Sequence, residues 1–342
     1  MNIKIEEHVE LKGMTTMRVG GNARFFVRVT TVDDLEETFL WIKEKGIPFF
    51  VLGGGSNTLI LDDGFDGIVI KMELRGIEYE ETETRVCVMA FAGEMWDSVV
   101  EDVVGRNLWG IENLSLIPGM VGGAFVQNIG AYGAEVCEYV AWVEAFNTHT
   151  METQRFLNDE CKFGYRESVF KNNPHLIVLR GAINLSRVPN MRIDYEDVKK
   201  YFEEEHIDSP TLKQIRNAVV SIRTEKMPSP PLGTAGSFFK NPVVSEERFK
   251  KLIQEFPHIK SYPHENNTVK ISAAFLLDKI GGWRGVRRGD AGVYEKQALI
   301  LVNHGNAKAR EIILLAQEMK KSIYEKINIE LEEEVVMMST RE

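Results

Sequence analysis

The sequence predicts an α+β protein of two or three domains, and three observations support this fold class. The chain has 342 residues, which exceeds the ~150 residues of an average domain. Hydrophobic residues make up 44% and charged residues 27% of it, as in an ordinary soluble globular protein. Segments with the period of an amphipathic helix alternate with short apolar runs bounded by glycine or proline, as helices and strands do.

The composition argues against several classes of protein. A net charge of −10 repels polyanions, so we expect no nucleic-acid partner. No apolar run reaches the ~20 residues that a membrane span needs, and the N-terminus lacks a secretory signal, so we expect a cytoplasmic protein without a membrane partner. Three widely spaced cysteines and seven scattered histidines lack the spacing of disulfide frameworks or metal ligands, so we expect no bound metal.

The N-terminal part predicts a mixed α+β domain. Residues 14–28 begin as a turn and continue as a strand. Thr31 followed by Asp34 resembles a capping pair, and Leu35 and later apolar residues recur on one face until Gly46, which predicts a helix. Strands are expected over 48–52, 67–71 and 85–90, and a second helix ends at Gly105.

A glycine-rich loop follows the strand over 48–52. It comprises Gly53, Gly54, Gly55, Ser56, Asn57 and Thr58. The amide groups of adjacent glycines are not blocked by side chains and can converge on a phosphate. The loop lacks the spaced glycines of a dinucleotide fingerprint and the lysine of a Walker loop, so it is either a phosphate cradle of another kind or only a turn.

A second glycine-rich segment spans residues 118–133. Five of its sixteen residues are glycine, several-fold above the ~7% average. This density suggests backbone lying against a large flat or charged ligand, and the alternative is a glycine-rich loop between core strands.

The remaining elements continue the alternation. We expect a strand over 175–180 and an amphipathic helix between Asp208 and Lys226. The proline-rich run at 227–233 is the best domain boundary in the chain. Beyond it we expect a helix with Phe249, Leu252 and Ile253, another that ends at Gly281, a strand over 298–302, a helix over 307–327 and a final strand.

Residues 234–242 place Ser237 between a glycine and two phenylalanines in a segment that cannot be regular helix. A hydrolase nucleophile needs glycines two positions either side of the serine, and Ala235 and Phe239 stand there instead. A proton-donor or binding role fits Ser237 better. The alternative is a glycine turn with a capping serine that leads into a strand ending at Pro242.

Taken in order, five segments resemble the UDP-N-acetylenolpyruvoylglucosamine reductase family, also called UDP-N-acetylmuramate dehydrogenases. They are the loop at 53–58, the segment at 118–133, Tyr165-Arg166-Glu167-Ser168, the stretch at 236–242 and Leu331-Glu332-Glu333-Glu334-Val335. The resemblance covers nearly the whole chain. It implies an FAD-binding domain of the vanillyl-alcohol-oxidase type with two α+β lobes, 1–71 and 72–225, followed by an α/β substrate-binding domain over 226–342.

The resemblance also implies the reaction and its participants. NADPH would reduce noncovalently bound FAD, which would then reduce the enolpyruvyl ether of UDP-N-acetylglucosamine to UDP-N-acetylmuramate, a step of peptidoglycan precursor synthesis. The protein would act on this small molecule as a monomer. The alternatives are another noncovalent FAD oxidoreductase of the same fold, or a non-catalytic nucleotide-sugar binding protein.

Site residues follow from the resemblance by matching motifs. Ser237 would donate the proton, and Arg166 and Glu334 would act on the enolate and carboxylate. The cofactor-binding positions are the loop at 53–58 together with Pro118, Gly119, Gly122, Gly123, Ala124, Gln127, Asn128, Gly130, Ala131, Tyr132 and Gly133. Substrate would be bound by Tyr165, Tyr195, Lys226, Asn241, Tyr262, Lys270 and Gln297, and the two tyrosines Tyr195 and Tyr262, with an insertion at 191–206, indicate a longer subgroup of the family.

Two points remain open in the sequence. If the last strand alternates strictly, Ile327, Ile329, Leu331 and Glu333 share one face and Glu334 points the other way. Either this apolar face is turned away from the site or a bulge resets the register. The basic strip at 284–289 could lie near ligand phosphates, but an exposed loop explains it better.

Overall fold

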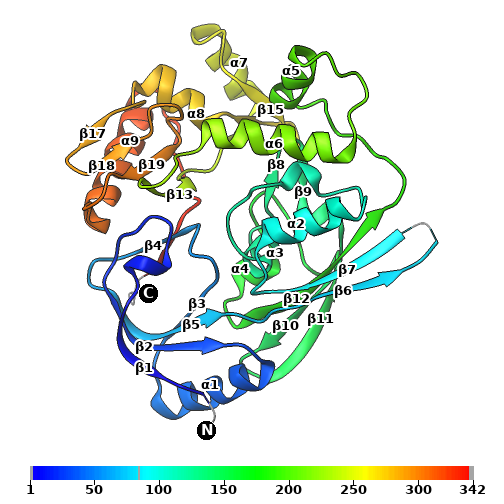
Figure 1. The fold of residues 1–342 in the computed structure, drawn as a ribbon. Coiled ribbons are helices and arrows are strands. Elements are labelled where there is room, and N and C mark those ends of the chain that lie inside the picture. Colours follow the sequence, from blue (N-terminus) through cyan, green and yellow to red (C-terminus); the bar gives the residue numbers. More distant parts are fainter. Residues whose placement is uncertain (1–2, 84, 339–342) are drawn as a thin grey trace. The chain divides into compact units, whose positions relative to one another are not determined.

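The computed structural model describes residues 3–83 and 85–338, which form two compact units (Figure 1). Unit 1 comprises the described residues of Met1–Val9, Ala23–Gly54 and Asp66–Glu225, and unit 2 those of Glu10–Asn22, Gly55–Phe65 and Lys226–Glu342. The two sets of buried hydrophobic residues follow the same division. Within the described ranges, no helix has the length and apolar character to cross a membrane.

The first sheet of unit 1 has the strand order β1-β2-β5-β3, and β3 and β5 run parallel. Helix α1 (Val32–Lys45) connects β2 to β3 and begins in the predicted capping box, in which Thr31 and Asp34 each bind the other's backbone amide. Gly46 ends the helix in the left-handed conformation, with φ of 62°. The strands are β1 (Glu6–Glu10), β2 (Asn22–Val29), β3 (Phe49–Leu52) and β5 (Phe65–Met72).

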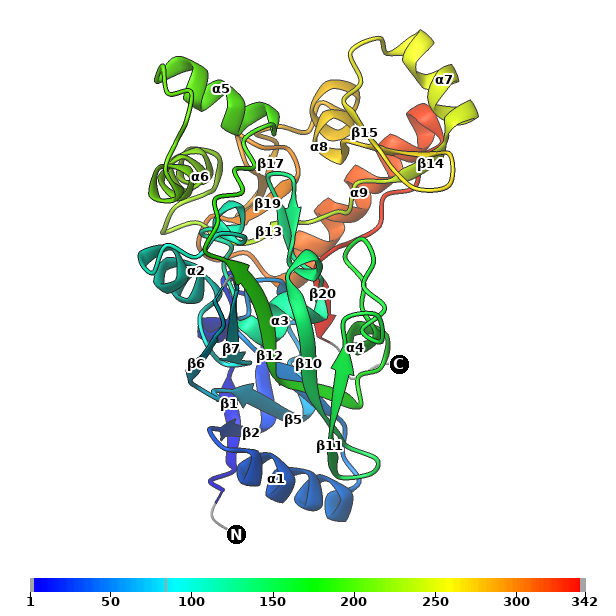
Figure 2. The same cartoon turned by 90° about the vertical axis from the view of Figure 1, so that its right-hand side faces the viewer.

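The second sheet of unit 1 is antiparallel in all its pairings and has the order β11-β10-β12-β7-β6. Figure 2 shows its long strands β12, β10 and β11 side by side. Alternate residues of β7, namely Val86, Val88 and Ala90, are buried in the core. The strands are β6 (Ile77–Glu81), β7 (Arg85–Phe91), β10 (Val140–Asn147), β11 (Glu152–Leu157) and β12 (Leu176–Ser186).

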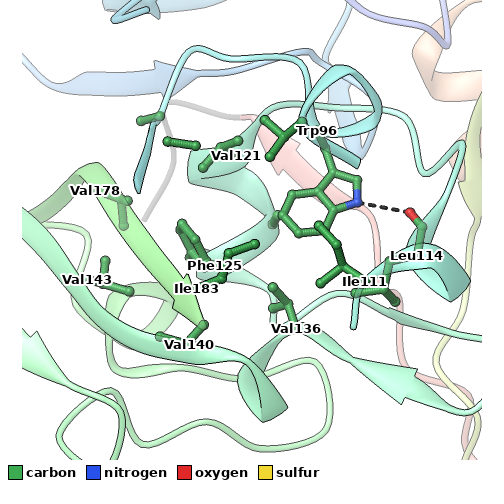
Figure 3. Close-up of a cluster of buried hydrophobic side chains, with 14 of the residues drawn as sticks. Trp96, Ile111, Leu114, Val121, Phe125, Val136, Val140, Val143, Val178 and Ile183 are labelled. Carbon is green, nitrogen blue, oxygen red and sulfur yellow. Dashed lines mark hydrogen bonds between the residues drawn. The ribbon is translucent and has the colours of Figure 1, made fainter. Parts of the chain in front are cut away.

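Two helices cover the core beside this sheet. In α2 (Trp96–Gly105), the fully buried Trp96 packs among valine, isoleucine and phenylalanine side chains, and its indole N–H donates to the carbonyl of Leu114 over 2.9 Å (Figure 3). The short helix α3 (Val121–Val126) contributes Val121 and Phe125 to the same cluster. The buried polar N–H therefore has its partner, as a buried indole requires.

The remaining elements of unit 1 are mostly short. The amphipathic helix α6 (Leu212–Lys226) buries Leu212, Ile215 and Val219 as predicted. Arg216 on the same helix binds both carboxylate oxygens of Asp97, over 2.7 and 3.0 Å. The others are α4 (Val169–Asn172), α5 (Glu196–Glu204), β8 (Gly130–Ala131), β9 (Ala134–Glu135) and the 3₁₀ turns η2 (Glu112–Leu114) and η3 (Val136–Glu138).

Unit 2 combines two small sheets with helices. One sheet has the order β13-β19-β18-β17, and the other has the order β14-β16-β15. Helix α9 (Ala309–Ile327) buries Ile312, Leu315, Met319 and Ile323 in the unit's core. The strands are β13 (Gly233–Ser237), β14 (Val243–Ser245), β15 (Ser261–Pro263), β16 (Thr268–Ile271), β17 (Arg287–Arg288), β18 (Ala291–Val293) and β19 (Ile300–Asn303), and the other helices are α7 (Glu246–Glu255), α8 (Ala273–Phe275) and the π-helical turn η4 (Leu276–Gly281).

Two N-terminal segments complete unit 2. Strand β4 (Thr58–Ile60) pairs in parallel with β20 (Val336–Met338) (Figure 1). The segment around η1 (Lys12–Met14) is also joined to this unit, because the amide of Thr234 donates to the carbonyl of Thr16. Asp62 accepts from the amides of Ala309 and Arg310, the first residues of α9. Sequence reasoning did not place residues 10–22 and 55–65 with the C-terminal domain, and the predicted domain limits stay predictions.

The expected helix with Phe249, Leu252 and Ile253 is present as α7, in which Leu252 is buried and Ile253 is 39% exposed. The expected start of the final strand was wrong. The final strand is Val336–Met338, and the residues before it form no regular strand apart from a single bridge between Phe239 and Glu333.

Candidate functional site

In unit 1, the two glycine-rich segments touch through their backbones. A Cβ atom on Gly54 would lie 2.9 Å from the Cα of Gly119, closer than real Cβ contacts allow. A Cβ atom on the neighbouring Gly53 would meet the Met120 side chain at 3.6 Å, an ordinary contact. Glycine at position 54 is thus required by this close approach, a contact between the two segments that the sequence did not predict.

Lys71 supports the first segment from β5. Its ammonium group donates to the carbonyl oxygen of Gly53. Burial lowers the pKa of Lys71, because the charged form loses solvation. A positive charge therefore lies beside the Gly53–Gly54 backbone, where the sequence alone gave no reason to place one.

The glycines of the second segment serve different purposes. Gly122 allows α3 to approach Ala92, since an added Cβ would lie 2.9 Å from that side chain. Gly123, one residue later, has no atom within 4 Å of such a Cβ and is exposed. Gly122 is therefore explained by packing, whereas Gly123 leaves bare backbone on an open face.

Arg166 is tied to the second glycine segment. Its guanidinium donates to the carbonyl oxygens of Gly130, over 2.9 Å, and Asn128, over 3.4 Å. The backbone of Arg166 is left-handed, with φ of 58°, within a tight turn in which Gly164 and Glu167 exchange hydrogen bonds. A non-glycine residue in this conformation is uncommon and marks a strained position held by its surroundings. The structure thus joins Arg166 to two residues predicted to bind cofactor.

Tyr195 and Tyr132 are also brought together in unit 1. Their rings meet edge to face with centroids 5.4 Å apart. Burial raises the pKa of the Tyr132 phenol, and the nearby charge of Arg223 opposes that rise. Arg223, on α6, also donates to the carbonyl of Leu116 over 3.2 Å. Sequence reasoning missed Arg223, although its seven-residue spacing from Arg216 places both on one face of the helix.

In unit 2, Ser237 ends β13 after a left-handed glycine, Gly236, with φ of 78°. The next two residues, Phe238 and Phe239, are fully buried, while Ser237 itself is exposed. The buried phenylalanines anchor the segment, so the exposed hydroxyl of Ser237 is held on a fixed backbone.

The segment after Ser237 pairs with the glutamate run. The amide of Glu334 donates to the carbonyl of Phe238 over 2.9 Å, and the amide of Lys240 donates to that of Glu332 over 2.8 Å. This antiparallel pairing brings the backbone of Glu334 to the residue that follows Ser237. Two of the three predicted catalytic residues therefore lie on neighbouring backbone segments of one unit.

The contacts of Glu333 bear on the open question about the two glutamates. The carboxylate of Glu333 accepts from Lys320 of α9 through both oxygens, and the apolar residues at two-residue spacing from it, Leu331 and Val335, are buried. The choice of Glu334 as the catalytic glutamate stays a prediction.

The loop at 53–58 is divided between the units. Gly53 and Gly54 belong to unit 1 and Gly55 to Thr58 to unit 2. Gly55 has φ of 63°, and a Cβ there would lie 2.3 Å from the carbonyl of Met14. Asn57 donates through its side-chain amide to the carbonyl of Glu334, and its own carbonyl accepts from Val336. This side chain therefore braces Glu334, a contact the sequence did not predict.

The predicted substrate-binding residues are distributed over both units. Tyr262 and Lys270 stand opposite each other on β15 and β16, and the side chain of Asn241 accepts from the amide of Ala273 over 2.9 Å. Gln297 accepts from the amide of Ile300 through its backbone, and Lys226 ends α6. Tyr165 lies next to Arg166 in unit 1, its ring centroid 5.4 Å from the guanidinium carbon.

The arginines of the basic strip at 284–289 are paired with acids. Arg284 meets Asp278, Arg287 meets Asp290, and Arg288 meets Glu318, over 2.9 to 3.4 Å. Their side chains are about half exposed. The strip is therefore exposed, as the second interpretation expected, but Arg287 and Arg288 within it form strand β17 and not a loop.

The fold, together with matches to two family models, defines an FAD-binding protein with a separate C-terminal domain. Residues 23–150 match the family model described as an FAD binding domain, and residues 228–338 match the C-terminal domain of UDP-N-acetylenolpyruvoylglucosamine reductase. The residues present fit FAD, because Gly123 leaves its backbone open and the ammonium group of Lys71 lies at the carbonyl of Gly53. The α+β fold class, with an FAD-binding domain followed by a C-terminal domain, is confirmed.

The chain belongs to the UDP-N-acetylenolpyruvoylglucosamine reductase family. It is 39% identical to the reductase of Pseudomonas aeruginosa over 337 residues, covering 98% of this chain and 99% of the relative. It is 40% identical to that of Flavobacterium johnsoniae over 339 residues, covering 97% and 99%. The crystal structure of the Thermus caldophilus enzyme superposes with a TM-score of 0.69 at 26% identity, covering 98% of this chain and 100% of that one.

Proposed function

We propose that this chain reduces the enolpyruvyl ether of UDP-N-acetylglucosamine to UDP-N-acetylmuramate, a step of peptidoglycan precursor synthesis. We infer further that NADPH supplies the hydride, that the enzyme works as a monomer in the cytoplasm, and that Tyr195 and Tyr262 place it in the longer subgroup of the family. Family membership and full-length similarity to named reductases support the reaction.

When bound, FAD would supply the hydride chemistry by accepting two electrons from the donor and passing them to the enolpyruvyl methylene carbon. We propose that the amides of residues 53–58 and of the segment 118–133 hold it noncovalently. Lys71, which contacts the carbonyl of Gly53, would add positive charge near a diphosphate.

The protein must then stabilise negative charge next to the substrate carboxylate and deliver one proton. We propose that Ser237 donates this proton, because a carbanionic carbon is basic enough to take it from a hydroxyl held beside it. Arg166 and Glu334 would act on the enolate and carboxylate. A guanidinium suits this task because it stays charged at any working pH. Tyr165, Tyr195, Lys226, Asn241, Tyr262, Lys270 and Gln297 would bind the nucleotide sugar.

One structural observation supports the roles proposed for Ser237 and Glu334. The amide of Glu334 bonds to the carbonyl of Phe238, so the exposed hydroxyl of Ser237 and the carboxylate of Glu334 are mounted on paired backbone segments. Such preorganisation is what delivery of a proton to a developing charge requires.

Stopped-flow spectroscopy of the two half-reactions tests the proposal. We expect the purified protein to show flavin absorption, to be bleached by NADPH, and to recover when the enolpyruvyl nucleotide sugar is added. A protein without flavin absorption that takes up no FAD would favour a non-catalytic binding protein. Flavin that is bleached by NADPH but not restored by the nucleotide sugar would favour another FAD oxidoreductase.

A further inference from the structure

Glu333 is the polar member of an otherwise apolar row. Leu331 and Val335 on the same side are 0% and 4% exposed. Lys320, one turn from the buried Ile323 on α9, reaches the Glu333 carboxylate with distances of 2.9 and 2.8 Å to its two oxygens. Both side chains are about a quarter exposed, so this ion pair is much less screened by solvent than a surface pair.

The carboxylate of Glu332 is bound by a second lysine, Lys240. Lys240 binds its carboxylate over 2.6 Å, and Lys240 is only 11% exposed. Two of the three adjacent carboxylates are therefore each bound by a lysine, and the two lysines come from different parts of unit 2. Lys320 holds Glu333 towards α9, and Lys240 holds Glu332 beside the segment that follows Ser237.

The backbone pairing of residues 332–334 with residues 238–240 fixes their register only weakly. Phe239 and Glu333 form an isolated bridge, and two flanking hydrogen bonds complete the pairing. A slip of one residue would bring Glu333 in place of Glu334 opposite Phe238 and would carry the Glu333 carboxylate away from Lys320, because side chains alternate. A charged pair within an apolar row specifies register, since any slip leaves a partly buried charge without its partner.

We propose that Lys320 and Glu333 are positioning residues, whose ion pair fixes the register in which Glu334 pairs with Phe238, the residue after Ser237. Neither residue is assigned contact with substrate or cofactor. The inference rests on the proposed roles of Ser237 and Glu334, and it predicts an effect on the substrate half-reaction that is separate from flavin reduction.

The test compares Lys320→Met with a matched control on the same helix. Lys321→Met removes a neighbouring lysine whose pair with Glu325 is more than 60% exposed on both sides. We expect Lys320→Met and Glu333→Leu each to slow single-turnover reoxidation by the nucleotide sugar by roughly 10- to 100-fold, the size that a misplaced group costs. Reduction by NADPH and the Kd of the product UDP-N-acetylmuramate should change by less than about twofold, because the lost contact acts on developing charge.

Two further measurements separate positioning from general stability. The charge-exchanged double variant Lys320→Glu with Glu333→Lys should recover most of the reoxidation rate. Hydrogen exchange at the Glu334 amide, which bonds to Phe238, should quicken in Lys320→Met and stay as in the wild type in Lys321→Met.

The outcomes are distinct. Equal reoxidation rates in Lys320→Met and Lys321→Met, or no change in exchange at Glu334, would overturn the positioning role. Parallel loss of both half-reactions without rescue by charge exchange would do the same, because it indicates a general structural defect. A wild-type enzyme that the nucleotide sugar cannot reoxidise would instead overturn the proposed function, while the exchange measurement would still decide whether the pair sets the register.

Discussion

The backbones of Gly54 and Gly119 approach so closely that a methyl group on Gly54 would lie 2.9 Å from the Cα of Gly119. Gly54→Ala should therefore push the two glycine segments apart, and overpacking of this kind costs typically 1–3 kcal/mol. We expect a lower melting temperature and at least about tenfold weaker FAD binding, since 1.4 kcal/mol is a factor of ten. Thermal unfolding and titration of flavin-free protein with FAD measure both.

Gly105→Ala is the control for this substitution, because Gly105 ends α2 and has nothing within 4 Å of an added Cβ. It should leave FAD binding unchanged. If Gly54→Ala keeps the stability and FAD affinity of the wild type, FAD binding does not need the close approach of Gly54 to Gly119.

Ser237→Ala should separate the two half-reactions. Loss of a general acid typically slows the step it serves by 10²- to 10⁴-fold, so reoxidation by the nucleotide sugar should fall by roughly this factor. Reduction by NADPH should be unaffected, because the hydroxyl has no part in it. Ser237→Cys retains an ionisable proton and should recover part of the rate. Equal slowing of both half-reactions in stopped-flow traces would argue against the proton-donor role.

The stability of unit 1 should depend on pH through Asp97. Burial alone would raise the pKa of Asp97, but hydrogen bonds from Arg216 and from the amide of Leu116 outweigh it and lower the pKa. A lowered pKa stabilises the folded protein above the ordinary carboxyl pKa of about 4, and this stabilisation is lost as the pH falls through the folded-state value. Asp97→Asn should therefore lower the free energy of unfolding by roughly 1.5–3 kcal/mol at pH 7 and by progressively less in acid.

Denaturant unfolding at several pH values measures this difference. Glu101→Gln removes an exposed carboxylate from the same helix and serves as the control. If the free energies of unfolding of wild type and Asp97→Asn differ by the same amount from neutral to acid pH, the stability does not depend on the lowered pKa of Asp97 and the prediction is wrong.

Asp62 caps α9 from a distant part of the chain. It accepts from the amides of Ala309 and Arg310 over 2.8 and 3.1 Å, so Asp62→Ala leaves both donors without this partner. Loss of an N-terminal cap costs typically about 1 kcal/mol and up to about 2, which we expect to appear as lower stability of unit 2. Proteolysis or hydrogen exchange of α9 measures it. The neighbouring Asp63→Ala is the control, and an equal effect in both variants would argue against capping.

Much of the fold could be predicted from local sequence. The capping pair of Thr31 and Asp34, the stop at Gly46 and the apolar face of α6 involve residues within a few turns of each other, so their patterns appear in the chain. Strand β6 was missed, because its burial pattern is mostly exposed and carries little apolar alternation. The short helix α3 was also missed, since two glycines within it weaken any helical pattern.

Contacts between residues far apart in the chain could not be predicted from local sequence patterns. Alternation placed Glu333 and Glu334 on opposite faces but could not say which face meets α9, because that depends on Lys320. Arg223 beside Tyr132 and Lys71 beside Gly53 were missed for the same reason. The family resemblance selected Glu334, and the structure shows that the neighbouring Glu333 is bound by Lys320 of α9.

The parallel pairing of β4 with β20 has a consequence for biosynthesis. Asn57 and Glu334, which bond across this junction, are 277 residues apart in the chain. On the ribosome, where domains generally fold as they emerge, residues 10–22 and 55–65 leave the exit tunnel long before the strand that completes them. The C-terminal unit must therefore mature after translation is nearly finished, and a separately expressed fragment starting at residue 226 would lack β4 and the helix cap that Asp62 provides.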